Sequence, residues 1–381
     1  MRKSYLFVLS LLFAVGASAK SEYNEPGNIL IADQFNNRVI EVDPRTGEIV
    51  FQFGLGPTDF SANSIIGVND AQRVGRDTLM VGTGTPYGFG DCTTIGGCLD
   101  NRVILVDVRG NIVWQYGQFG VTGSGPNELS TPVQATWLPT VGSHVLITDQ
   151  GNQRVIEVNR ATKEVVWQYG TTGMTGTDPN FLNSPNSAEL LPNGHILIAD
   201  EVNNRAIEVN RNHQILRTFT AGGTVNAAAF ASRLPNGNTL ITSSNNNLVI
   251  EVNYRDEIVW QFDTHSSDNP QPTRAIRLAN GNTIISNQFQ NTVLIVDHRM
   301  PANIVKTFGY VDSSGYDPDT VRIAPGVTGG GLFAPYDAKV IGDFTGLTPP
   351  FVSDHRRDRD RDRDRDRDRD RDDGDDGRHR R

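Results

Sequence analysis

The chain has 381 residues, of which 37% are hydrophobic and 21% charged, and its 38 glycines and 19 prolines are spread along the sequence at turn-like intervals. This composition is typical of a turn-rich globular fold. The formal net charge of -9 argues against nucleic acid as a partner, because binding to phosphates requires a basic surface.

The first 19 residues have the pattern of a secretory signal peptide. A basic start at Arg2 and Lys3 is followed by a short apolar stretch up to Val15 and a small-residue cleavage site that ends at Ala19. The apolar stretch is shorter than the roughly 20 residues that a membrane-spanning helix needs. We therefore expect cleavage after Ala19 and a secreted or periplasmic mature protein with no transmembrane segment.

The body of the chain, residues 20–350, contains six copies of one segment. The first copy reads NILIADQFNNRVIEVDPRTGEIVFQFG. The copies begin at or near Asn28, Asp77, Ser143, Gly194, Gly237 and Gly281. Each copy contains three short apolar strands separated by Asn, Asp and Gly turns, and a fourth strand precedes it. This period predicts an all-β, six-bladed β-propeller of four-stranded antiparallel blades.

The first copy lacks the preceding, innermost strand, and a matching segment is found at the other end of the repeat region. Ala334 to Ile341, which reads APYDAKVI, aligns with SPNSAELL from Ser184. We expect this C-terminal strand to complete blade 1 and to close the ring, which removes the open edge of a linear array.

Several motifs carry a family resemblance. The stretch GSGPNELSTP from Gly123 and the Ala-Asp-x-x-Asn-Asn-Arg runs at Ala32 and Ala199 resemble NHL-repeat propellers. Blades that end in Val-Trp-Gln-Tyr or Val-Trp-Gln-Phe are similar to the PQQ-like and arylsulfotransferase-like bacterial propellers. The resemblance covers about residues 28–345 and implies a propeller. It selects no single activity, because such propellers include ligand sensors, partner-binding platforms, lyases and transferases.

The residues that recur in the copies are interpreted as structural. Asp33 with Arg38 recurs at the same places in later copies, as do Glu41 and the tryptophan represented by Trp114. A catalytic residue is needed once, whereas an ion pair that fixes a blade is needed in each copy. No histidine falls at an innermost-strand position, so the histidine nucleophile of arylsulfotransferase chemistry has no candidate there.

The candidate site is sought where the copies differ, along the innermost strands that line the channel of a propeller. Seven polar or aromatic residues at two adjacent positions of these strands are taken as candidates: Asn69, Asp70, Gln134, Asn186, Arg274, Tyr336 and Asp337. They would converge on one channel mouth as a ligand-binding site. Their carboxylates and amides would also suit a divalent cation such as calcium. The alternative is a water-filled channel with solvated polar walls.

An insertion, Thr83 to Asp100, interrupts the second copy and contains both cysteines of the chain. Cys92 and Cys98 are predicted to form a small disulfide, because two thiols this close in an exported protein favour pairing, and they lack the C-x-x-C spacing of a redox-active pair. Tyr87 and Phe89 make the insertion either an exposed knob for a partner or a neutral decoration.

After Phe351 the sequence changes to eight Arg-Asp dipeptides from Arg357, followed by DGDDGRHRR. From Asp354 onward there are no apolar residues to bury, and the tail, residues 351–381, is predicted to be disordered. It either contacts the cell envelope or other proteins, or is an inert repeat expansion.

Two functions remain open at this point. The first is a non-enzymatic secreted or periplasmic binding or scaffold propeller, which presents its channel mouth and loops to a protein, a glycan or a small ligand. The second is an extracytoplasmic propeller enzyme, either a metal-dependent lyase or hydrolase or an arylsulfotransferase-like transferase.

Overall fold

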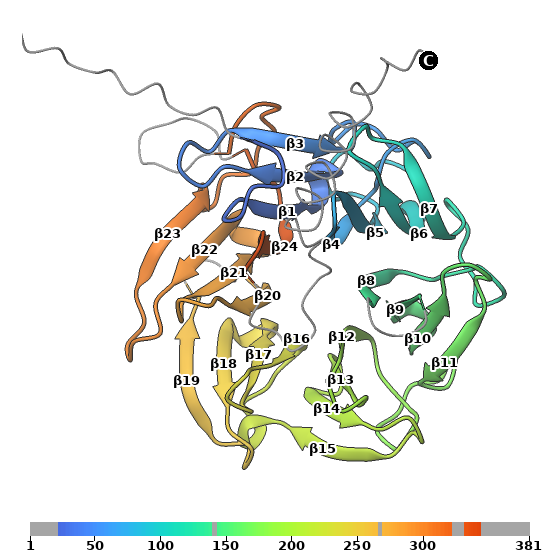
Figure 1. The fold of residues 1–381 in the computed structure, drawn as a ribbon, viewed down its shortest axis with the longest axis vertical. Helices are drawn as coiled ribbons and strands as arrows, with labels where there is room; N and C mark the ends of the chain where they lie inside the picture. The colour runs from blue at the N-terminus through green and yellow to red at the C-terminus, as the bar shows by residue number, and fades with distance from the viewer. Residues whose placement is uncertain (1–21, 139–142, 266–268, 322–330, 344–381) are drawn as a thin grey trace, which may run out of the picture.

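The computed structural model describes residues 22–138, 143–265, 269–321 and 331–343. The expected signal peptide and the Arg-Asp tail lie outside these residues. Six four-stranded sheets stand around a central axis as the blades of a propeller (Figure 1). Neighbouring strands within each sheet are antiparallel, so the predicted fold class is confirmed. No helix in the described part of the chain is long and apolar enough to cross a membrane.

Each blade runs from an innermost strand at the axis to an outermost strand at the rim. Blade 1 consists of β24 (Pro335–Val340), β1 (Ile29–Asp33), β2 (Arg38–Val42) and β3 (Ile49–Phe53). Blade 2 consists of β4 (Val68–Val74), β5 (Asp77–Thr85), β6 (Cys98–Val106) and β7 (Ile112–Gly117). Blade 3 consists of β8 (Pro132–Leu138), β9 (His144–Asp149), β10 (Arg154–Asn159) and β11 (Val165–Tyr169).

The remaining three blades follow the same order. Blade 4 consists of β12 (Pro185–Leu190), β13 (Ile196–Asp200), β14 (Arg205–Val209) and β15 (Ile215–Phe219). Blade 5 consists of β16 (Ala228–Arg233), β17 (Thr239–Ser243), β18 (Leu248–Val252) and β19 (Ile258–Asp263). Blade 6 consists of β20 (Pro272–Arg277), β21 (Thr283–Asn287), β22 (Thr292–Val296) and β23 (Ile304–Gly309).

The ring is closed by strand β24, as the sequence predicts. It pairs antiparallel with β1 in a register that places Ala338 opposite Ile31, and Figure 1 shows its orange-red ribbon beside the blue of β1. The strand is one residue shorter at each end than the expected range of 334–341. Backbone hydrogen bonds continue the contact at Ile341, whose N–H donates to Asn28 O at 2.8 Å.

A repeated side-chain clip joins each blade to the next. One residue of each blade has a left-handed backbone, with φ between 49° and 59°; it directly precedes the third strand in five blades and lies inside β6 in blade 2. Its side-chain oxygen accepts a hydrogen bond of 2.6 to 3.0 Å from the backbone N–H at the entry to the innermost strand of the next blade. The six clips are Asn37 to Gly67, Asn101 to Thr131, Gln153 to Ser184, Asn204 to Ala227, Asn247 to Gln271 and Asn291 to Ala334. Asparagine tolerates this backbone and carries the required acceptor, which explains the second Asn of the repeated Asn-Asn-Arg motif.

The glycine that ends the outermost strand lies against the same clip. Gly54 and Gly170 have positive φ values of 113° and 97°. A Cβ on either residue would lie 2.1 or 2.2 Å from the carbonyl oxygen of Asn37 or Gln153. Only glycine allows this close approach together with the positive φ.

Apolar side chains fill the spaces between neighbouring blades. One core cluster packs Leu30 and Val39 of blade 1 against Met80 and Ile104 of blade 2. These strands alternate their faces with period two, so each sheet contributes one face to each neighbouring interface.

The recurring Asp and Arg residues form buried ion pairs, as predicted. Arg38 Nε lies 2.9 Å from Asp33 Oδ2, and neither side chain is exposed to solvent. The same guanidinium donates to the carbonyl oxygens of Asp317 and Gly331, while the other Asp33 oxygen accepts from Phe333 N–H. The pair therefore fixes the chain segment that leads into the closing strand.

The recurring Glu and Trp side chains also contact the neighbouring blade. Glu251 of blade 5 lies 2.9 Å from the guanidinium of Arg277 in blade 6. Arg277 stacks over the Trp260 ring at 4.7 Å, and Trp260 Nε1 donates to Arg299 O at 3.1 Å. The interpretation of the recurring tryptophans as structural is supported, because Trp114 and Trp167 also donate to the following blade.

The insertion in blade 2 lengthens the hairpin of β5 and β6. Strands β5 and β6 extend into both of its ends, where Thr85 pairs with Cys98. The predicted disulfide between Cys92 and Cys98 is present, with both cysteines buried. Tyr87 is 61% and Phe89 48% exposed, so the tip of the insertion presents aromatic side chains to solvent.

Candidate functional site

The innermost strands bring two consecutive residues toward the axis because each contains a β-bulge. The register with the neighbouring strand skips one residue at this point, as at Asn69 in β4 and Asn186 in β12. A bulge breaks the strict alternation of side chains and re-aims one of them. Both candidate positions of the sequence analysis can therefore face the channel.

Four charged side chains form one buried cluster where blades 1, 2 and 6 meet. Lys339 Nζ lies 2.6 Å from Asp70 Oδ1 and also bonds Asp337. Arg274 lies 3.7 Å from Asp70 and 3.6 Å from Asp337. Its guanidinium carbon lies 4.8 Å from the centroid of the Phe230 ring. The structure thus brings Asp70, Arg274 and Asp337 together around a lysine that the sequence analysis did not single out.

The shifted pKa values show which of these groups is charged at neutral pH. Burial acts to lower the pKa of Lys339, but the charges of Asp337 and Asp70 outweigh it, so the net shift is upward. Burial acts to raise the pKa of Asp70, but Lys339 and Arg274 outweigh it, and the net shift is downward. Burial raises the pKa of Asp337, which also faces the like charge of Asp70. Lys339 is therefore a cation and Asp70 an anion.

The position that a metal ion would take between the two carboxylates is occupied by the Lys339 ammonium. Asn186, another of the candidate residues, bonds Glu201 and Tyr336 instead. Within the described residues no group of three or more His, Cys, Asp or Glu side chains could hold a metal ion. A divalent cation does not fit the donor set of this cluster.

Several channel side chains form hydrogen bonds to the neighbouring blade. Asp70 Oδ2 accepts from Ala135 N–H at 3.0 Å, and Gln134 Oε1 accepts from Ala188 N–H at 2.6 Å. Ser187 and Asp337 accept in the same way from the blade that follows each of them. These residues differ between copies but share a structural role, because each offers an oxygen at the same point of the channel wall.

A second network connects opposite sides of the ring. Tyr336 of blade 1 donates to Asn186 of blade 4 at 3.2 Å, and Asn186 Nδ2 donates to Glu201 at 2.9 Å. Burial raises the pKa of both Tyr336 and Glu201. Asn69 accepts from Gln34 in a separate contact on the same bulge layer. Tyr336 and Asn186 therefore use their polar groups to bridge the channel, Asn69 bonds the adjacent blade, and the seven candidates do not form one site.

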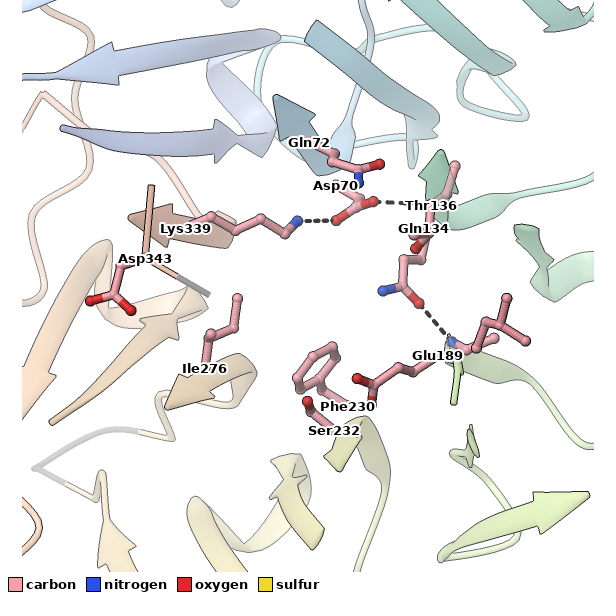
Figure 2. Close-up of a pocket in the computed structure, with 13 residues that line it drawn as sticks. Asp70, Gln72, Gln134, Thr136, Glu189, Phe230, Ser232, Ile276, Lys339 and Asp343 are labelled. Carbon is pink, nitrogen blue, oxygen red and sulfur yellow. Dashed lines mark hydrogen bonds and ion pairs between the residues drawn. The ribbon is translucent and has the colours of Figure 1, made fainter. Parts of the chain in front are cut away.

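A pocket with a cavity volume of about 100 Å³ lies in the channel beside the charged cluster, with Asp70 and Lys339 in its wall (Figure 2). All six blades contribute to its wall. The lining residues are Asp70, Gln72, Gln134, Ala135, Thr136, Ala188, Glu189, Leu190, Phe230, Ser232, Ile276, Lys339 and Asp343. Of the seven candidates, Asp70 and Gln134 line this pocket.

The sequence analysis missed the position that contributes most to the pocket. This position lies two residues beyond the second candidate position in each innermost strand, and it is occupied by Gln72, Thr136, Glu189, Ser232, Ile276 and Lys339. The period-two alternation of a strand places these side chains on the same face as Asp70 and its equivalents. The alignment of the copies could have indicated this position, because it lies two residues beyond the second candidate position in every copy.

The size of the cavity limits what it encloses. A cavity of about 150 Å³ holds a benzene molecule, and sites for drug-sized ligands span roughly 300 to 1,000 Å³. The channel pocket, at about 100 Å³, encloses one small molecule or one terminal group of a larger molecule. It is too small to enclose the fused rings of a quinone cofactor.

The chain was compared with known families and proteins. No family model matches it, and no curated protein sequence matches it. Among solved structures, it is similar to a protein of unknown function from Bacteroides caccae, with 15% identity, a TM-score of 0.47, and coverage of 72% of this chain and 91% of that one. It is also similar to virginiamycin B lyase from Staphylococcus aureus, with 11% identity, a TM-score of 0.47, and coverage of 75% and 92%.

A further solved structure, hydrazine synthase from Kuenenia stuttgartiensis, shares 11% identity with a TM-score of 0.42, and the match covers 62% of this chain and 65% of that one. These matches are similarities in the path of the backbone. Their identities and TM-scores carry no argument about what the channel pocket binds.

Proposed function

We propose that the protein is a secreted or periplasmic, non-enzymatic binding propeller, of the NHL or PQQ-like type, whose channel pocket holds a small polar ligand. The observation that carries this proposal is the pocket itself. It lies on the axis, receives side chains from all six blades, and is lined by carboxylate, amide, hydroxyl and ammonium groups together with Phe230, Leu190 and Ile276. A concave site with a few convergent polar groups among apolar ones is typical of small-molecule binding.

The state of the charged side chains supports binding rather than catalysis. Lys339 has a raised pKa, so it is protonated at neutral pH and is a poor nucleophile or general base. Asp70 has a lowered pKa and is already engaged by Lys339 and by Ala135 N–H. The histidines in the blades serve other contacts, as His195 does with Glu208 at 2.7 Å.

The extracytoplasmic location is supported by the disulfide between Cys92 and Cys98, because such bonds persist mainly in oxidising compartments. The signal peptide makes a further testable claim. Mass spectrometry of the exported protein should give Lys20 as its first residue. A mature protein that retains residues 1–19 would contradict it.

Binding in the pocket is tested by a thermal-shift screen of the full chain against small polar compounds. A ligand that binds the native state raises the melting temperature. The control is Ser232→Phe, whose ring would fill the pocket from a wall residue with 8% exposure. We expect hits that stabilise the wild type and not the variant. Hits that stabilise both proteins equally, or the absence of any hit, would overturn the proposal.

A further inference from the structure

We propose that the ligand of the channel pocket is a neutral polyhydroxylated molecule, a small polyol or the hydroxyl-bearing edge of a terminal sugar ring. This inference rests on the proposed function, since it names the chemical class that the same pocket selects. It is carried by the positions of hydrogen-bond donors and acceptors on the pocket wall, which the contacts between blades fix in orientation.

Two glutamine amides present their nitrogen to the pocket. Gln134 uses its Oε1 to accept from Ala188 N–H at 2.6 Å, and Gln72 uses its Oε1 to accept from Trp137 N–H at 2.7 Å. A backbone N–H can only donate, so each contact determines which end of the amide is oxygen. Neither Nε2 has a hydrogen-bond partner among the described residues, although Gln72 is 4% and Gln134 9% exposed. Figure 2 shows the Gln134 nitrogen directed into the channel.

Acceptors and hydroxyls face these donors across the pocket. The Glu189 carboxylate points toward the axis in Figure 2, and one of its oxygens is held by Arg233 N–H at 2.7 Å. Thr136 and Ser232 add hydroxyl groups to the wall, each able to donate and accept. A ligand that matches this wall must itself both donate and accept in several directions, which is the property of a polyol.

The pocket also has an apolar side for the C–H groups of such a ligand. Phe230 lines the pocket beside Ile276 and Leu190. The guanidinium of Arg274 stacks against the Phe230 ring at 4.8 Å and thereby supports it. A ring with polar edges and an apolar face would meet the amides and the phenyl group at once.

The wall charges argue against an anionic ligand, and the amide donors argue against an ammonium ligand. Among the pocket residues that the structure describes, the acidic Asp70, Glu189 and Asp343 outnumber the basic Lys339, so an anion would meet a net negative wall. All three N–H donors of Lys339 are already used, on Asp70, Asp337 and the carbonyl of Ala71. An ammonium ligand would in turn leave the two glutamine N–H₂ groups facing another donor, and unpaired buried donors are costly.

The test is isothermal titration calorimetry on the full chain, with glycerol, myo-inositol, D-glucose, D-galactose and N-acetyl-D-glucosamine as neutral probes, and with acetate, sulfate and tetramethylammonium as ionic probes. The decisive variant is Gln134→Glu. Its carboxylate still accepts from Ala188 N–H, so the contact between blades is kept while the donor toward the pocket is lost. The matched control is Gln118→Glu, which makes the same change at an exposed residue.

We expect at least one neutral probe to bind the wild type. The same probe should bind Gln134→Glu at least tenfold more weakly and should bind Gln118→Glu with unchanged affinity. Methyl glycosides of the sugar that binds then distinguish two natural sources of the ligand. A site for a free sugar would reject the methyl glycoside, whereas a site for the end of a glycan chain would accept it. Equal affinity for Gln134→Glu and the wild type would overturn the inference.

The inference and the proposed function fail in different ways. If only ionic probes bind, and Ser232→Phe abolishes their binding, the pocket is a ligand site and the polyol inference is wrong. If no probe of any class binds, both are wrong.

Discussion

The blade-to-blade clip at the closure of the ring makes a quantitative prediction. Asn291 has a left-handed backbone with φ of 58°, and its Oδ1 accepts from the buried Ala334 N–H at 3.0 Å. Asn291→Ala leaves that N–H without a partner, which costs about 1–3 kcal/mol, and places alanine in the left-handed region, which costs roughly 1–2 kcal/mol. The free energy of unfolding should therefore fall by about 2–5 kcal/mol in total.

Two further substitutions separate these effects. Asn291→Gly removes only the acceptor and should be destabilised by about 1–3 kcal/mol, whereas Asn291→Asp keeps an acceptor and should stay close to the wild type. The control is Lys163→Ala, since Lys163 is exposed with φ of 61° and clips no other blade. Urea unfolding followed by tryptophan fluorescence measures all four variants. The clip has no energetic role if Asn291→Ala unfolds at the same urea concentration as the wild type.

Three other outcomes are expected from the same contacts. Ending the chain after Phe333 removes β24, exposes the inner edge of blade 1 and should abolish cooperative unfolding; an unchanged melting temperature would refute closure. Lys339→Met leaves the buried carboxylates of Asp70 and Asp337 with the more distant Arg274 guanidinium, 3.7 and 3.6 Å away. The loss of the lysine should cost about 3–5 kcal/mol, measured by urea unfolding, so a neutral result would contradict the cluster. Burial acts to raise the pKa of Glu208, but hydrogen bonding from His195 and the charge of Arg233 outweigh it and the net shift is downward; a lowered folded pKa adds stability above the unfolded pKa near 4.5, which is lost as the pH falls. The stability difference between the wild type and Glu208→Gln should therefore be present at pH 7 and be lost as the pH falls below 4.5 and through the lowered folded pKa, and a difference that persists in strong acid would refute this reasoning.

The fold was predictable because its information is repeated. Each copy shows the same strand spacing and the same turn residues, so errors in one copy are corrected by the others. The missing first strand predicted closure by the C-terminal segment, and the spacing of Cys92 and Cys98 predicted their disulfide. Both predictions are confirmed.

The site was harder to predict because its contacts run between copies. Tyr336 and Asn186 lie 150 residues apart in sequence and meet only because blades 1 and 4 face each other across the ring. Asp70 and Gln134 vary between copies, as binding residues would, yet their oxygens are used by the next blade. The distance across the channel decides such contacts, and no local pattern in the sequence encodes it.

Lys339, at the centre of the charged cluster, is a second residue whose contacts could not be predicted from the sequence. Lys339 follows the candidate Asp337 by two residues, so the alternation of a strand places it on the channel face. Its significance depends on Asp70 from another blade, which turns a lone lysine into a bridge between two carboxylates. Sequence position alone predicts where the side chain points, whereas the partner comes from the assembled ring.

The most direct test of the account follows the side-chain amides of the pocket during ligand binding. In ¹⁵N-labelled protein, the NH₂ resonances of Gln72 and Gln134 can be assigned by their loss in Gln72→Glu and Gln134→Glu. We predict that these two resonances shift on titration with the best neutral ligand, while the NH₂ resonance of Gln118 stays in place. Saturating binding that leaves the resonances of Gln72 and Gln134 unmoved would place the ligand elsewhere and contradict the account.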